Sequence, residues 1–140
     1  MTTTTSVFTP VELAYLRSQR IARLATLGPD GGPQVKAVGF LVDAETGTID
    51  IPSLDNPSTQ KWRNVQGDGR VALIVDDVIV DSWQPRSVEV RGIAEALPDV
   101  LHGDAFPGVR PGVIRIHPRR ILVFGLDDPD SPGTRNVSAA

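Results

Sequence analysis

The apolar residues of this chain are gathered into short runs, each followed by turn residues. The unbroken run Val71–Val75 is typical of a strand buried on both faces, and the alternation over residues 87–97 indicates a half-solvated one. Gly28-Pro29-Asp30-Gly31-Gly32 supplies the residues that a tight turn needs. Further strands are expected at residues 21–27, 34–42, 48–51, 113–117 and 121–126, the last two being separate or one strand bent at Pro118. This pattern predicts a mainly β fold, a small and mostly antiparallel barrel.

Two short helices interrupt the strands. Thr9 is a typical N-cap, Pro10 suits the first helical position, and Glu12 completes a capping box. The second helix is expected at residues 58–66 and ends at a glycine-rich turn. We therefore expect one cofactor-binding domain over residues 9–127, a flexible N-terminus over 1–8 and a flexible tail over 128–140.

Composition excludes several classes of function. The chain has 140 residues, a net charge of −3 and no cysteine. Thiolate nucleophiles, zinc–thiolate sites and iron–sulfur clusters are therefore excluded, and the acidic balance argues against nucleic-acid binding. No run reaches the ~20 apolar residues that span a bilayer, and no secretory leader is expected. These features predict a cytoplasmic protein without nucleic-acid or membrane partners.

The helix at residues 58–66 is a candidate phosphate site. Its first turn exposes free N–H groups, Ser58 or Thr59 caps it, and Lys61 and Arg63 add positive charge. Because residues i and i+2 face different sides of a helix, the two cations would contact different parts of a ligand. The alternative is an ordinary solvated helix.

Two other features suggest a site for a flat ring. Gly39, at the end of the segment Gln34–Gly39, allows either a planar ligand or another backbone to approach closely. Trp83 stands in a loop, where it could stack on an aromatic ligand, fill a dimer seam or anchor the core. His102 and His117 lack the spacing of metal ligands, and no nucleophile–base pair is visible, so we predict neither a metal site nor a catalytic side chain. Any difficult chemistry would belong to a cofactor.

Several segments, taken in order, resemble the pyridoxamine-phosphate-oxidase-like split-barrel superfamily. The resemblance covers roughly residues 9–127 and is closest to the actinobacterial branch that uses the deazaflavin coenzyme F420. Within that branch the chain is similar to a group that includes a reductase of oxytetracycline biosynthesis. The segments that carry the resemblance are Arg23–Leu27, Pro29–Gly31, Pro33–Val35, Val38–Phe40, Lys61–Val65, Val71–Asp77, Trp83–Arg86 and Val88–Gly92.

The resemblance implies a homodimer of split β-barrels with two cofactor sites at the seam. It implies that Lys61 contacts the cofactor phosphate with Arg63 close by, and that Trp83 lines the site. The cofactor-binding residues that we expect are Lys36, Ala37 and Val38 (whose backbone would lie against the ring), Ser58, Thr59, Lys61, Arg63 and Trp83. The chain departs from the family at three positions, having Thr59-Gln60 where an arginine is common, Ala37 for a proline and Phe124 for a tryptophan.

The predicted function is that of an F420-dependent oxidoreductase. It would transfer a hydride from the reduced deazaflavin to a conjugated double bond of a planar, small organic substrate. The alternatives are an FMN-dependent oxidase or reductase of the same fold and a protein that binds or carries F420 without turnover.

Overall fold

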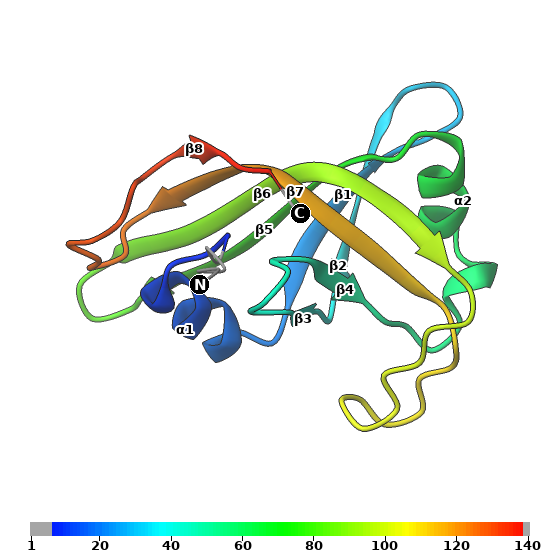
Figure 1. Ribbon diagram of the computed structural model, residues 1–140, viewed down its shortest axis with the longest axis horizontal. Helices are drawn as coiled ribbons and strands as arrows, with labels where there is room; N and C mark the ends of the chain where they lie inside the picture. The colour runs from blue at the N-terminus through cyan, green and yellow to red at the C-terminus, as the bar shows by residue number, and fades with distance from the viewer. Residues whose placement is uncertain (1–6, 139–140) are drawn as a thin grey trace, which may run out of the picture.

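A single curled sheet dominates the computed structural model, which describes residues 7–138 (Figure 1). Its strand order is β2-β1-β5-β6-β7-β4-β3, β8 adds to β7, and every pairing is antiparallel. The strands are β1 (Ala22–Leu27), β2 (Pro33–Val38), β3 (Leu41–Val42), β4 (Ile49–Ile51), β5 (Arg70–Ile79), β6 (Gln84–Leu97), β7 (Val113–Phe124) and β8 (Arg135–Asn136). The helices are α1 (Pro10–Ser18), the 3₁₀ turn η1 (Asn56–Ser58) and α2 (Gln60–Gly67). The prediction of a mainly β fold with two short helices is confirmed.

The concave face of the sheet encloses the core. Val71, Leu73 and Val75 of β5 point inward and are buried, whereas Ala72 and Ile74 between them are only half-buried. The sequence suggested a strand buried on both faces, and this was wrong for the single chain because nothing within residues 7–138 covers the outer face of β5. Residues 7–138 contain no helix long and apolar enough to cross a membrane.

Two strand predictions changed in detail. The segment 34–42 is broken at Gly39 into β2 and β3, which form the two edges of the sheet. In contrast, the segment 113–126 contains one strand, β7, which passes Pro118 with a bulge opposite Arg91 and Gly92. A Cβ at Gly92 would lie 2.2 Å from the His117 carbonyl oxygen, so only glycine fits the bulge.

The helix α1 begins with the predicted capping box. Thr9 Oγ1 accepts from the Glu12 amide at 3.1 Å, and Glu12 Oε1 accepts from the Thr9 amide at 2.9 Å. Glu12 is fully buried, and Arg135 donates to both of its oxygens at 2.7 and 3.0 Å. The segment 128–138, which the sequence suggested as a tail, thus contains β8 and lies against α1. Most of the predicted flexible N-terminus, residues 1–6, lies outside the described residues.

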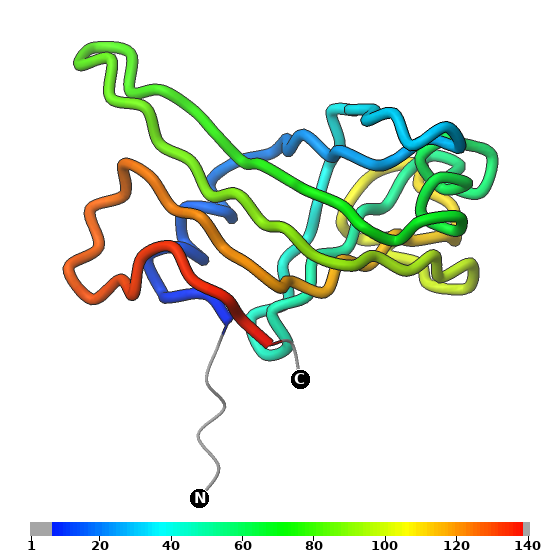
Figure 2. The backbone as a smooth tube through the Cα atoms, turned by 90° about the horizontal axis from the view of Figure 1, so that it is seen from above, coloured from blue at the N-terminus to red at the C-terminus, as the bar shows by residue number. Residues whose placement is uncertain are grey.

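The β5–β6 hairpin projects beyond the rest of the molecule (Figure 2). Trp83 is in its turn with a positive φ of 53° and 78% of its surface exposed. Because a left-handed backbone costs a bulky residue about 1–2 kcal/mol, the turn holds this side chain outward in an unfavourable conformation. The option of Trp83 as a core anchor is therefore wrong.

Candidate functional site

The chain contains only two lysines, and the fold places them together. Lys36 is on β2 and Lys61 is on α2. Gln34, two residues before Lys36 on the same face of β2, accepts from Asn64, which is one helical turn after Lys61. The helix therefore crosses the strand so that Asn64 faces Gln34 and Lys61 faces Lys36.

The two lysines form an electrostatically unsatisfied pair. Burial and the neighbouring charge of Lys36 lower the pKa of the half-buried Lys61 amine. Among residues 7–138, no carboxylate lies within ion-pair distance of either lysine. Two like charges held together without a counter-charge attract an anion. In a chain of net charge −3, this is a local feature rather than part of a basic surface.

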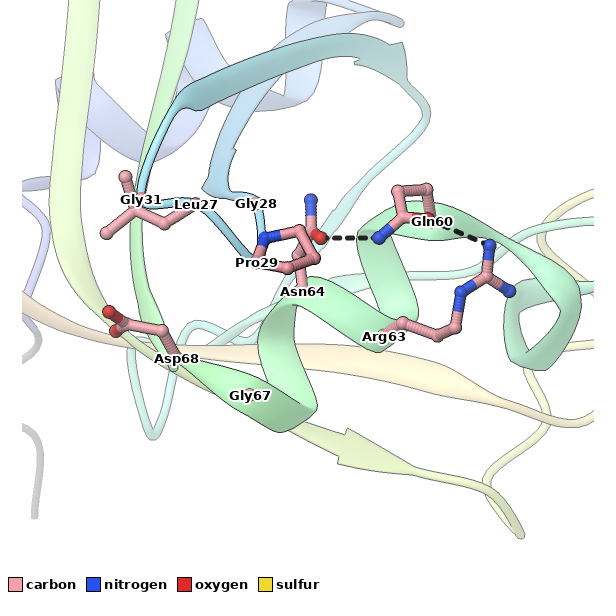
Figure 3. Close-up of a pocket in the computed structure, with 9 residues that line it drawn as sticks. All are labelled: Leu27, Gly28, Pro29, Gly31, Gln60, Arg63, Asn64, Gly67 and Asp68. Atoms are coloured by element: carbon pink, nitrogen blue, oxygen red, sulfur yellow. Dashed lines mark hydrogen bonds between the residues drawn. The ribbon is translucent and has the colours of Figure 1, made fainter.

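A chain of amide groups fixes α2 in this position. Asn64 is buried and donates to Thr26 Oγ1 and Gln34 Oε1, both at 2.9 Å. The Gln60 side chain donates to Asn64 Oδ1 at 2.8 Å, and its amide oxygen Oε1 accepts from Arg63 at 2.9 Å (Figure 3). These bonds hold Arg63 beside a pocket of about 530 Å³ between the β1–β2 turn and α2. The pocket is lined by Leu27, Gly28, Pro29, Gly31, Gln60, Arg63, Asn64, Gly67 and Asp68.

The two hydroxyls at the start of α2 are already engaged. Thr59 is the N-cap, where it accepts from the Trp62 amide and donates to the Asn56 carbonyl at 2.7 Å. Ser58 donates to the Asp55 carbonyl at 2.9 Å. A hydroxyl has one proton to donate, so either residue would have to exchange its present bond to contact a phosphate. For Lys61 and Lys36, by contrast, no side-chain hydrogen bond or ion pair is present among residues 7–138.

The edge position of β2 leaves one side of its backbone without a strand partner in the described chain. Lys36 and Ala37 are exposed there, and Val38 is buried at the end of the strand. A flat ring could therefore approach this backbone beside the two lysines. The arrangement thus combines an anion site with a surface for a planar group.

Trp83 lies away from the lysines within one chain. Lys36 pairs with Leu24, and Leu24 pairs with Leu73. The end of β5 at Ile79 is six residues beyond Leu73, which is roughly 20 Å along an extended strand. Of the eight predicted residues, Arg63 faces the pocket and Trp83 is remote from the lysines. The other six are on β2 or around the start of α2, namely Lys36, Ala37, Val38, Ser58, Thr59 and Lys61.

The sequence did not reveal Gln34, Gln60 and Asn64 as the residues that position the site. Asn64 could have been identified as a positioning residue, because it is a polar residue next to the inward-facing Val65 on a helix with two cations. Its partners on β1 and β2 could not be identified from the sequence, since they depend on how α2 crosses the two strands.

A curled antiparallel sheet with two short helices is the architecture of the split-barrel proteins. The chain belongs to the pyridoxamine 5'-phosphate oxidase family, whose model matches residues 8–126. The split-barrel prediction is thereby confirmed. The chain is also similar to the 5a,11a-dehydrotetracycline/5a,11a-dehydrooxytetracycline reductase of Streptomyces rimosus, with 42% identity over 135 residues and 94% of each protein covered.

Solved structures show the same fold at lower identity. A conserved hypothetical protein of Mycobacterium tuberculosis has a TM-score of 0.68 and 23% identity, with 99% of this chain and 98% of that one covered. The haem storage protein of Vibrio cholerae has a TM-score of 0.61 and 14% identity, with 81% and 92% covered. At these identities the likeness concerns the fold alone.

Proposed function

We propose that this protein is a reductase that uses coenzyme F420 to reduce a conjugated double bond of a planar, polycyclic substrate. The observation that carries the proposal is the unsatisfied pair Lys36–Lys61 beside the free edge of β2. The 42% identity to a reductase of dehydrotetracyclines supports both the reaction class and a tetracycline-like substrate.

The residues present fit a cofactor with a phosphate and a flat ring. Lys61 and Lys36 would hold the phosphate, and the backbone from Lys36 to Val38 would lie along the ring. Reduced F420, when bound, supplies the hydride. The protein contributes position and electrostatics, with the amide chain through Asn64 keeping α2 and its lysine at a fixed distance from β2.

The choice of cofactor can be tested by titrating the purified protein with oxidised F420 and, separately, with FMN, following absorbance and fluorescence. We expect tighter binding of F420. Lys61→Ala removes a charge-assisted contact of ~1.5–3 kcal/mol and should weaken F420 binding roughly tenfold to a hundredfold. Arg17→Ala, which removes an exposed cation on α1, is the matched control and should leave affinity unchanged.

Each alternative predicts a different result. Micromolar FMN binding without detectable F420 binding would replace the proposal by flavin chemistry. Tight F420 binding without reduction of any dehydrotetracycline would favour a carrier protein. If Lys61→Ala binds F420 like the wild type, the lysine pair is a surface feature and the site lies elsewhere.

The same proposal includes a homodimer with the cofactor sites at its seam. The outer sheet face leaves Val35 exposed and Ala72 and Ile74 half-exposed, and the hairpin presents Trp83 to solvent. A second copy would cover these apolar groups and bring its Trp83 toward the lysines of the first. Light scattering across a dilution series should give the mass of a dimer, and Trp83→Ala should weaken F420 binding. A monomer that binds F420 at full strength would contradict a shared site.

A further inference from the structure

We propose that a second, apolar pocket, at the end of the strand that carries Lys36, takes the hydrophobic ring end of the substrate, and that Phe106 and Leu54 are the residues that select for it. This inference rests on the proposed function, because it identifies where a planar substrate would lie. The pocket measures about 280 Å³ and is lined by Gly39, Pro52, Leu54, Phe106, Pro107 and Val109.

The pocket has the chemistry of an aromatic site. None of its lining side chains is charged, so a charged group entering it would lose its hydration without compensation. Leu54 has 67% of its surface exposed, and together with the other lining residues it forms an apolar patch rather than a single exposed side chain. A flat hydrocarbon or aromatic ring is therefore the group that this surface favours.

Gly39 allows Phe106 to form one wall. A Cβ at this position would lie 3.1 Å from Cε1 and 3.2 Å from Cζ of the Phe106 ring. A side chain at this position would push the ring away from the end of β2 by a few tenths of an ångström, so glycine favours this close packing. The break in the strand predicted over 34–42 therefore occurs where the phenylalanine contacts the backbone.

Hydrogen bonds anchor the two segments that carry the walls. Asn56, which is fully buried, donates to the carbonyls of Ile51 and Gly112 at 2.8 and 2.9 Å and so holds the segment that carries Leu54. The loop that carries Phe106 is held by the bond between His102 and the buried Asp50, 2.7 Å long. A pocket with fixed walls loses less entropy when a ligand binds.

The position relative to the lysines suits a substrate beside a cofactor. Gly39 is three residues after Lys36, which is roughly 10 Å along an extended chain. A ligand seated against the Phe106 ring would therefore lie beyond the Val38 end of the backbone segment from Lys36 to Val38. The neighbouring pocket around Asp50 and Arg115 suits a polycyclic ring less, because it is lined by charged groups that are already paired with one another.

The test is tetracycline binding, measured by calorimetry with the full chain in the presence and absence of F420. Phe106→Ala and Leu54→Ala should each weaken tetracycline binding roughly fivefold to tenfold, the size of a lost aromatic or apolar contact. Phe106→Leu should retain most of the affinity, since it keeps the wall apolar. Leu101→Ala is the matched control, because Leu101 is an exposed apolar residue of the same loop that does not line the pocket.

The two proposals fail in different ways. Wild-type affinity for tetracycline in both Phe106→Ala and Leu54→Ala would overturn the pocket assignment, and so would a wild-type protein that does not bind tetracycline at all. F420 affinity should change less than twofold in these variants, so the cofactor proposal would survive either result. If both alanine variants also lost F420 binding, the effect would be general, and the assignment of Phe106 and Leu54 to the substrate would be wrong.

Discussion

Two pairs of charged side chains on opposite sides of the molecule are arranged in contrasting ways. Near α1, the buried carboxylate of Glu12 is matched by Arg135, whose guanidinium also donates to the carbonyls of Val7 and Gly133 at 2.8 and 2.9 Å. Near α2, Lys36 and Lys61 have like charges and no acidic partner within residues 7–138. The first pair completes its own hydrogen bonds, and the second has donors without a partner in the described part of the chain.

The difference separates a structural cluster from a binding site. A charge buried with a full set of partners holds two segments of chain together and has nothing left to offer a ligand. A pair of like charges costs stability unless something external neutralises it. Mutations of Glu12 or Arg135 should therefore change the stability of the protein, whereas mutations of Lys36 or Lys61 should change its affinity for a ligand.

The largest effect on stability is expected at Glu12. Glu12→Gln preserves the capping box but leaves Arg135 without its counter-charge, which should cost about 3–5 kcal/mol of unfolding free energy. Urea denaturation measures this loss. The double variant Glu12→Gln/Arg135→Met should recover part of it, because no unpaired charge remains. A loss below about 1 kcal/mol would place the cluster among ordinary surface pairs.

An anion that binds the lysine pair should stabilise the folded protein. At a phosphate concentration 100 times its dissociation constant, the wild-type protein should gain about 2.7 kcal/mol, seen as a rise in Tm. Chloride at equal ionic strength should give a much smaller rise. The double variant Lys36→Gln/Lys61→Gln should not respond to phosphate specifically. An equal response in wild type and double variant would mean that phosphate binds elsewhere.

The smallest effect concerns the ligand-free protein. Lys61→Met should not destabilise it and should raise its stability slightly, within the roughly 0.5 kcal/mol typical of surface substitutions. The folded pKa of Lys61 lies below its ordinary value of 10.5, so the cost of its charge is fully present below the folded pKa. The advantage of the variant should therefore disappear as the pH rises through about 10.5. A destabilised variant at neutral pH would show that Lys61 is part of the core packing.

Local pattern was enough to predict most of the fold. The apolar runs located the strands, and Thr9 and Glu12 located the first helix because their capping bonds span only three residues. The break at Gly39 and the bulge at Gly92 were harder, since each is set by a side chain or carbonyl from a distant strand or loop. The contact between Glu12 and Arg135 could not be predicted for the same reason, since the two residues are 123 positions apart in the sequence.

The site could be predicted only in part. Lys61 was identified from its place in a short helix, and Lys36 from a family resemblance, but their proximity depends on how α2 crosses β2. The amide contacts of Asn64 that set this crossing join segments 30 and 38 residues away. Trp83 was recognised as an aromatic in a loop, yet its distance from the lysines follows from strand register, which no single segment encodes.

Lys36 has a second consequence that concerns solubility. It stands on β2, an edge strand with five of its six residues exposed, between Val35 and Ala37. A lysine at such an edge discourages the strands of other molecules from pairing with it, because its charge would be buried in the new sheet. Replacing Lys36 by an apolar residue would create the run Val35–Val38 on an open edge and invite aggregation. The cation that we assign to a ligand thus also keeps the ligand-free protein dispersed, and a polar substitute such as glutamine is the sounder choice for mutagenesis.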